Sequence, residues 1–221
     1  MGKYPPRMQQ VLIFDYDGVI VDSLPIFMDY FIDACKKQGY SNIASKKEFL
    51  RLFNGNMFEQ MMKKGMGKKT ILNIVYTLKK GLIDHQHEIK LFPEIKQVLE
   101  KLTDQHTLII STSNETTVVS DYLKQKRLYR FFNAIYGSDV EPSKVKKIEL
   151  IKQNYTSNIY TYIGDTVGDI KEGKQAQVQT VATTWGWHSK EKLLQTNPDY
   201  VADQPYDLLS LFIDESLVKI D

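Results

Sequence analysis

Residues 11–23 read VLIFDYDGVIVDS, and this stretch decides the fold. The apolar run at 11–14 predicts a buried strand that ends at two carboxylates, Asp15 and Asp17, followed at once by Gly18. In an open α/β sheet, ligands bind outside the carboxyl ends of the strands. Because the chain has to turn near Gly18, both carboxylates can face one pocket. Two anions held this close need a cation or a shared proton, so the stretch predicts a metal site, a proton-transfer site or both.

The composition is that of an ordinary folded protein, with 221 residues of which 42% are hydrophobic and 25% are charged. A net charge of +2 indicates no bulk attraction to nucleic acid. The charge is unevenly spread, because residues 18–90 hold 12 Lys and Arg against 7 Asp and Glu. This excess indicates either a solvated helical surface or a surface that attracts anionic substrates.

Several signals concern the location of the protein. Cys35 is the only cysteine, which excludes an intramolecular disulfide and fits a reducing compartment; it lies in an apolar helical stripe and is expected to pack there. No apolar run is long enough to cross a membrane, and residues 1–10 lack the apolar core of a signal peptide. We therefore expect a cytoplasmic protein, monomeric or weakly dimeric, with no nucleic-acid or membrane partner.

The order of elements predicts an α/β fold with a doubly wound parallel sheet. A helix begins near Asp22 or Ser23, which can cap it, and further helical patterns cover 46–53, 56–64 and 69–80, with no convincing strand between 22 and 90. From Pro93 helices and strands alternate, which means crossover connections and a parallel sheet. The predicted strands lie at 107–111, 134–136, 159–163, 180–183 and 200–201, and the predicted helices at 94–102, 117–126, 144–153, 167–175 and 206–217. We expect residues 1–21 and 91–221 to form the core and residues 22–90 a helical cap.

Three further strand ends carry polar residues. Asp165 and Asp169 follow the strand at 159–163 and share one helix face, which suits Mg²⁺, although Asp165 can equally cap the next helix. Thr112 lies in the hydroxyl cluster Ser111–Asn114, which is either an anion site or a plain helix cap. Lys144 can reach a phosphoryl group as a point charge, or lie on the surface. A parallel sheet brings these strand ends together with Asp15. The succession of polar residues at four strand ends is therefore a stronger indication of a site than any one of them alone.

This order resembles the haloacid dehalogenase-like hydrolase superfamily over essentially the whole chain. Residues 15–19, DYDGV, match the first motif of the family, and residues 164–169 match the fourth; the hydroxyl cluster and Lys144 match the looser second and third motifs. Residues 181–187 look like the strand and turn of phosphoglycolate phosphatase-like members. Two features depart from the pattern: Lys144 lacks the usual following proline, and the second motif can be placed on Ser111 or on Thr112, of which Thr112 fits the distance to the next helix better.

The resemblance implies a role for each site residue. Asp15 is the expected nucleophile that forms an aspartyl-phosphate, and Asp17 the acid and base. The remaining assignments follow from the same motifs. The expected phosphate-binding residues are Gly18, Thr112, Ser113, Asn114 and Lys144, of which Thr112 and Lys144 also stabilise charge during catalysis, and the expected Mg²⁺ ligands are Asp15, Asp17 through its carbonyl, Asp165 and Asp169.

The substrate is expected to be a small phosphorylated metabolite. A Mg²⁺-dependent phosphatase similar to phosphoglycolate phosphatase is the leading hypothesis, because dehalogenase relatives generally lack a carboxylate at the position of Asp17. The alternatives are a sugar-phosphate mutase similar to β-phosphoglucomutase, which shares both aspartates, and a non-catalytic binding module on the same fold.

Two interpretations apply to each of several further residues. Arg51 and Gly55 in the cap are either specificity residues or a surface arginine and a turn glycine, and Trp185 and Trp187 either line the entrance or pack in the core. The histidines have no ligand spacing and are expected on helix or loop surfaces; they are His85, His87, His106 and His188.

Overall fold

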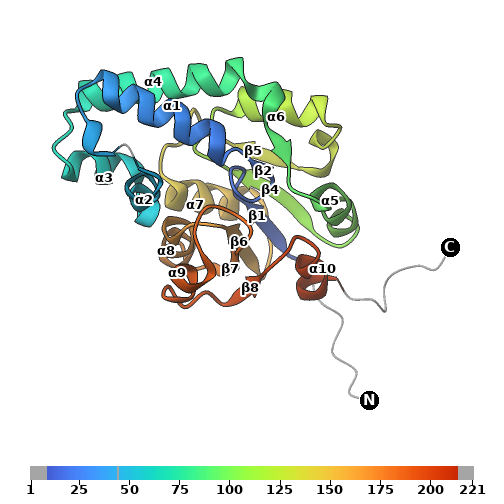
Figure 1. The fold of residues 1–221 in the computed structure, drawn as a ribbon. Coiled ribbons are helices and arrows are strands. Elements are labelled where there is room, and N and C mark those ends of the chain that lie inside the picture. The colour runs from blue at the N-terminus through green and yellow to red at the C-terminus, as the bar shows by residue number, and fades with distance from the viewer. Residues whose placement is uncertain (1–8, 44, 214–221) are drawn as a thin grey trace.

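The computed structural model describes residues 9–43 and 45–213. A parallel six-stranded sheet with the order β5-β4-β1-β6-β7-β8 forms its centre (Figure 1). The strands of this sheet are β1 (Val11–Phe14), β4 (Thr107–Ser111), β5 (Ala134–Tyr136), β6 (Tyr160–Gly164), β7 (Gln179–Thr183) and β8 (Tyr200–Ala202). Because β4 and β5 extend the sheet on one side of β1 and β6 to β8 extend it on the other, the strand order reverses at β1. Ligands of doubly wound sheets bind at this reversal.

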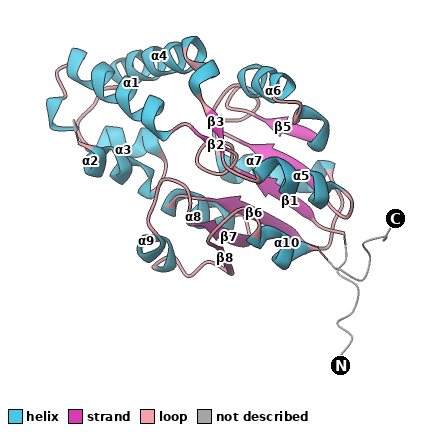
Figure 2. Ribbon diagram, turned by 45° about the vertical axis from the view of Figure 1, so that its right-hand side comes forward, coloured by secondary structure: helices cyan, strands magenta, loops and turns pink. Residues whose placement is uncertain are grey.

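Strand β1 is buried on both of its faces, as the unbroken apolar run predicts for a parallel sheet. The sheet lies between two layers of helices (Figure 2). Successive side chains of β1 point to opposite faces of the sheet and so alternate between these layers. Leu12 and Phe14 belong to the larger apolar cluster, which includes the buried faces of α5 (Ile95–Thr103) and α10 (Asp207–Phe212). Val11 and Ile13 belong to the cluster on the other face, with α7 (Lys144–Asn154).

Two further helices of the core flank the strand ends. Helix α6 (Thr116–Gln125) follows β4, and helix α8 (Val167–Gln175) follows β6 and packs against β6 and β7. The short helix α9 (Lys190–Leu194), which was not predicted, follows β7 and packs against α8. These positions place the N-termini of α6, α7 and α8 near the carboxyl ends of the central strands.

A helical block follows β1 and lies over the carboxyl ends of the strands (Figure 1). It contains α1 (Leu24–Lys37), α2 (Lys46–Arg51), α3 (Met57–Lys63) and α4 (Lys68–Asp84), with 3₁₀ turns at Ser41–Ile43, Leu52–Asn54 and Gln86–Glu88. Helices α1 and α4 lie side by side and approach closely at Gly81, where any side chain would collide with the ring of Tyr30. The two-residue strands β2 (Val21–Asp22) and β3 (Lys90–Leu91) pair in antiparallel orientation where the chain enters and leaves the block.

An aromatic cluster joins the block to the core. Phe27, Phe49 and Phe53 of the block surround Trp187 of the core, with ring centroids 5.0, 5.8 and 4.8 Å from the indole. Such aromatic pairs contribute roughly 0.5–1.5 kcal/mol each beyond the burial of their surface. The cluster therefore holds the block at a defined position over the sheet.

The predicted α/β class with a parallel sheet and the succession of its strands along the chain are confirmed, and most element boundaries agree within two residues. The pair β2 and β3 was missed because a two-residue strand has no readable alternation. The last helix ends at Phe212, and residues 214–217 of its predicted span lie outside the described residues. Among the described residues, no helix is both long and apolar enough to cross a membrane.

Candidate active site

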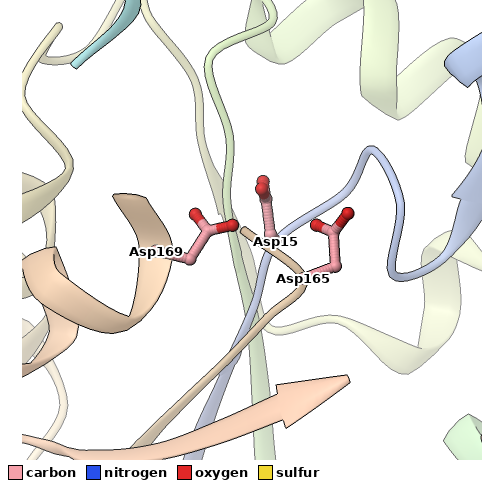
Figure 3. Close-up of side chains that lie close together, drawn as sticks. All are labelled: Asp15, Asp165 and Asp169. Atoms are coloured by element: carbon pink, nitrogen blue, oxygen red, sulfur yellow. The ribbon is translucent and has the colours of Figure 1, made fainter. Parts of the chain in front are cut away.

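Three carboxylates meet at the carboxyl ends of β1 and β6. Asp15 follows β1, Asp165 follows β6, and Asp169 lies in the first turn of α8. All three are buried, and each offers an oxygen within 4.8 Å of those of the other two. Figure 3 shows the three carboxylate groups next to one another, with Asp15 between Asp169 and Asp165. Buried carboxylate oxygens at this spacing match the ligand type of a divalent cation.

The turn between β6 and α8 separates the tasks of its two aspartates. Thr166 is the N-cap of α8: its hydroxyl accepts from the backbone N–H of Asp169, whose carboxylate accepts from the backbone N–H of Thr166. The alternative in which Asp165 caps this helix is therefore wrong. Asp165 Oδ2 accepts from the N–H of Trp187 at 2.7 Å, and Oδ1 is buried with no hydrogen-bond partner among the described residues. A buried carboxylate oxygen without a partner is costly, so this atom fits a metal ligand.

Lys144 is the cation of the cluster, not a surface lysine. Its Nζ lies 2.8 Å from Asp15 Oδ2 and 2.5 Å from Asp169 Oδ1, although 129 residues separate it from Asp15. The side chain of Ser143 caps α7, so Lys144 is the first residue of this helix and projects from its N-terminus. Burial alone would lower the pKa of Lys144, but Asp15 and Asp169 outweigh burial and raise it, which keeps the lysine charged.

The carboxylates differ in their affinity for protons. Burial raises the pKa of Asp15 to about 7, against the opposing effect of Lys144. Burial and the neighbouring carboxylates raise the pKa of Asp165 well above its ordinary value. For Asp169, burial is outweighed by Lys144 and by the hydrogen bonds from Thr166, so its pKa is lowered. One lysine thus does not offset the cost of ionising all three carboxylates, whereas a divalent cation would favour their ionised forms.

Asp17 stands apart from this cluster and is held by two donors. The Ser23 hydroxyl donates to its Oδ1 at 2.5 Å, and the Asn114 amide donates to its Oδ2 at 2.6 Å. The prediction that Ser23 caps the following helix is wrong for its side chain, which forms no cap hydrogen bond there. Burial raises the pKa of Asp17, while these two hydrogen bonds lower it. Two donors on one carboxylate fix its orientation toward the cavity.

Gly18 lies where only glycine fits. Its φ of +78° is in the left-handed region, and a β-carbon at this position would collide with the carboxylate of Asp165. The turn after β1 therefore brings the backbone against the end of β6.

The segment after β4 places its three polar residues differently. Ser113 and Asn114 line the cavity described below. Thr112 is fully buried and is not among the lining residues: its hydroxyl accepts from the N–H of Asn114 at 3.1 Å. Ser111, the other position considered for the family motif, is also fully buried. The structure thus brings Ser113 and Asn114 to the cavity surface and sets Thr112 directly behind them.

A cavity of about 330 Å³ opens between the carboxylates and the helical block. Its core side includes Asp15, Asp17, Lys144 and Asp169. Its block side is mainly apolar and includes Phe53, Met57, Leu72, Val75, Leu78 and Leu82. This volume is at the lower end of the range for small-molecule sites, roughly 300–1,000 Å³.

Several residues near the site were missed by the sequence reasoning. Lys147 is fully buried and donates to the carbonyl of Thr112. Glu172 lines the cavity, and burial raises its pKa to about 7. Each lies three positions after a site residue on the same helix, Lys147 after Lys144 and Glu172 after Asp169, and this spacing was the available signal.

The histidine prediction is half wrong. His106 and His188 are buried, with 4% and 2% of their surface exposed. His188 Nδ1 accepts from the N–H of Val167, which leaves the hydrogen on Nε2 to donate to the carbonyl of Leu50 in the block at 2.8 Å. His85 and His87 keep exposed side chains, as expected.

Three other side chains that the sequence singled out lie in the core, on the surface or at the cavity. Cys35 is buried in the core, as expected. Arg51 is exposed and paired with Glu48 on its own helix. Trp187 both packs in the aromatic cluster and lines the cavity, so the two readings considered for it hold together.

Comparisons with known proteins agree with this geometry. A family model described as haloacid dehalogenase-like hydrolase matches residues 12–183. Over 203 residues the chain is 24% identical to phosphoglycolate phosphatase from Synechococcus elongatus, with 90% of this chain and 95% of that protein covered. Over 209 residues it is 25% identical to pyrophosphatase PpaX from Oceanobacillus iheyensis, with 91% and 96% covered.

A solved structure shows the same arrangement of the chain. A hydrolase of the haloacid dehalogenase-like family from Streptococcus pneumoniae superposes with a TM-score of 0.78 at 30% identity, with 92% of this chain and 98% of that chain covered. The family model includes the strand that carries Asp15 and the turn that carries Asp165 and Asp169. The chain therefore belongs to the haloacid dehalogenase-like hydrolase family.

Proposed function

We propose that this hydrolase removes the phosphate group from a small phosphomonoester through an aspartyl-phosphate, with Mg²⁺ bound, in the manner of a phosphoglycolate phosphatase. One observation carries the proposal: Asp15 lies on the cavity wall in direct contact with Lys144 and beside Asp165 and Asp169. This is the arrangement that a carboxylate nucleophile needs in order to approach an anionic phosphoryl group.

Asp15 is the proposed nucleophile. Its Oδ1 accepts from the N–H of Tyr16 at 2.8 Å and its Oδ2 from Lys144, so the carboxylate has a fixed orientation. An oxygen of Asp15 forms a bond to phosphorus while the bond from phosphorus to the leaving oxygen breaks. Water later attacks the phosphorus of the aspartyl-phosphate, which releases inorganic phosphate and restores the carboxylate.

Asp17 is the proposed acid and base. Because burial raises its pKa, Asp17 holds a proton more readily than an exposed carboxyl group, and this proton passes to the leaving oxygen. The carboxylate that remains then accepts a proton from the attacking water. Ser23 and Asn114 hold the group on the cavity wall for both steps.

The oxygens of Asp15, Asp165 and Asp169, with the carbonyl of Asp17, are the proposed ligands of Mg²⁺. When bound, Mg²⁺ neutralises carboxylate charge and polarises the phosphoryl oxygens, so that one anion can attack another. The unpartnered Oδ1 of Asp165 supports this assignment.

The proposed contacts of the phosphoryl group are Lys144, Ser113, Asn114 and the backbone at Gly18, with Thr112 supporting them from behind. Residues 22–90 act as the cap and residues 1–21 and 91–221 as the core. The cap excludes bulk water from the cavity and contacts the leaving group. The cytoplasmic location and the monomeric or weakly dimeric state stay predictions from the sequence.

Pyrophosphate hydrolysis is a second candidate, which the similarity to pyrophosphatase PpaX favours. A phosphate-release screen over small phosphomonoesters and pyrophosphate, with Mg²⁺, separates the two. Asp15→Asn should abolish release, whereas Asp33→Asn, which changes an exposed aspartate of α1, should leave it unchanged. Equal turnover by wild type and Asp15→Asn would contradict the proposal, and release that requires a sugar bisphosphate activator would indicate a mutase.

A further inference from the structure

The cavity has two chemically different walls. The core wall carries most of the charged groups, whereas the wall formed by the helical block is lined mainly by aliphatic and aromatic side chains, with Asn56 and Lys79 as its polar side chains. Helix α4 contributes half of its apolar side chains, with Leu72, Val75, Leu78 and Leu82 at the spacing of one helix face. In the proposed reaction the phosphate occupies the core wall, so the leaving group lies against this apolar wall.

Among the described residues of the block, no unpaired cation lines the cavity. Of the block residues that the structure describes, Lys79 is the only Lys or Arg in the lining, and its Nζ is paired with Glu115 at 2.7 Å. Arg51 is exposed and paired with Glu48, away from the lining. The lysine excess of residues 18–90 is therefore a solvated surface as far as this cavity is concerned, and does not provide a binding site for a second anionic group.

Glu172 adds a carboxylate on the opposite side of the cavity. Burial raises its pKa to about 7, so the surroundings already disfavour one negative charge at this position. A carboxylate or a second phosphate on the leaving group would lie against the apolar wall, where the described residues offer it no unpaired cation. Burying an unpaired charge in this way is strongly unfavourable.

We propose that the leaving group is an uncharged, largely apolar alcohol, so that the substrate class is alkyl or aryl phosphate monoesters. The proposal rests on the proposed phosphatase function and narrows it away from leaving groups that carry a charge, such as glycolate and phosphate. A cavity of about 330 Å³ suits an alkyl chain of several carbons or a single ring, together with the phosphate.

Alkyl phosphates of increasing length provide the first test. Ethyl, butyl and hexyl phosphate have leaving groups of nearly equal basicity, so differences in kcat/KM report contact with the apolar wall. We expect kcat/KM to rise with chain length, by up to about fourfold for each fully buried methylene. The kcat/KM for hexyl phosphate should also be higher than the kcat/KM for phosphoglycolate and for pyrophosphate. A flat series, or a preference for either charged substrate, would overturn the proposal.

A pair of variants on α4 tests the wall itself. Val75→Asp places a carboxylate in the lining and should flatten the alkyl series, while Tyr76→Asp changes the next residue, which is 72% exposed and outside this lining, and should leave the series as in wild type. If Val75→Asp does not fold, Leu72→Asp replaces it, because Leu72 lines the cavity with 62% of its surface exposed. A series that keeps its slope in a folded lining variant would contradict the proposed contact.

Binding of alkylphosphonates separates this proposal from the proposed function. These compounds keep the phosphorus dianion and the chain but cannot be hydrolysed at the carbon–phosphorus bond by this chemistry. Calorimetry with ethyl-, butyl- and hexylphosphonate in Mg²⁺ buffer should show affinity that rises along the series. If affinity for the phosphonates rises with chain length but none of the alkyl phosphates is hydrolysed, the phosphatase function is refuted and the apolar binding site is supported. If the alkyl phosphates are hydrolysed but neither kcat/KM nor phosphonate affinity depends on chain length, the phosphatase function is supported and the apolar site is refuted.

Discussion

Lys147 provides a test of how the site is built beneath its reacting groups. Its side chain is fully buried in α7, and its Nζ donates to the carbonyl of Thr112 at the end of β4. Burial, and then the nearby charge of Lys144, lower the pKa of Lys147 from 10.5 to about 8. The folded protein therefore holds a lysine that releases its proton more easily than it would in the unfolded chain.

The sign of the effect on stability follows from proton binding. Below pH 8 Lys147 is charged in both states, and the folded state carries the full cost of the buried charge. Between pH 8 and 10.5 the unfolded chain binds more protons than the folded one, so the free energy of unfolding rises with pH. At about 1.36 kcal/mol for each pKa unit, the rise due to this lysine is about 3 kcal/mol.

Lys147→Met removes both the charge and the hydrogen bond. At neutral pH the relieved cost of charge burial offsets the loss of about 1–3 kcal/mol from the unsatisfied Thr112 carbonyl, so the variant should equal or exceed wild type in stability. Near pH 10.5 the lysine is neutral in wild type and only the loss remains. The order of the two proteins should therefore reverse between these pH values.

Urea unfolding followed by circular dichroism, in EDTA and from neutral pH to pH 10.5, measures this difference. Lys146→Met is the matched control, because Lys146 is exposed on the same helix, and its curve should stay parallel to that of wild type. Parallel curves for wild type and Lys147→Met would refute the reasoning. So would a loss of several kcal/mol in Lys147→Met already at neutral pH.

Three further predictions concern the site. Gly18→Ala should weaken Mg²⁺-dependent activity at least tenfold, because the new β-carbon would displace Asp165. Gly39→Ala is the control: Gly39 also has a positive φ but has open space around it, so this variant should keep the activity. A Mg²⁺ titration of phosphate release measures both variants. Saturating Mg²⁺ should stabilise the fold by about 2.7 kcal/mol at a hundredfold excess over Kd, and Asp165→Asn should remove this increase in a thermal melt. Ser23→Ala removes a hydrogen bond that lowers the pKa of Asp17, so the alkaline limb of the pH–rate profile should move to higher pH and kcat should fall roughly tenfold; an unmoved limb would argue against Asp17 as the acid.

The sequence predicted the elements of the core well because their signals are local. A short apolar run that ends at Asp15 and Gly18 is typical of a buried strand, and each later strand is recognisable by the turn or cap residues that follow it. The positions of Asp15, Asp165 and Asp169 at strand ends followed in the same way, since a parallel sheet brings those ends together.

Other features depend on contacts between distant segments. Ser23 has the pattern of a helix cap, yet its hydroxyl donates to Asp17, because the turn after β1 brings that carboxylate within reach. His188 lies in a segment with the composition of a surface turn, yet the block covers it, and its Nε2 is hydrogen-bonded to the Leu50 carbonyl. Periodicity and capping rules describe neighbours along the chain and contain no information on which group lies across a cavity.

The sequence by itself determined the parallel sheet, the helical insertion after its first strand and the carboxylates at its strand ends, because strand length, helix period and turn residues are local properties. The tertiary structure alone decided that Lys144 pairs with Asp15 across 129 residues, that Lys147 is buried beneath Thr112, and that the block presents an apolar wall to the cavity. Side-chain pairing and burial depend on how separate segments pack against one another, and packing is settled only when the whole chain has folded.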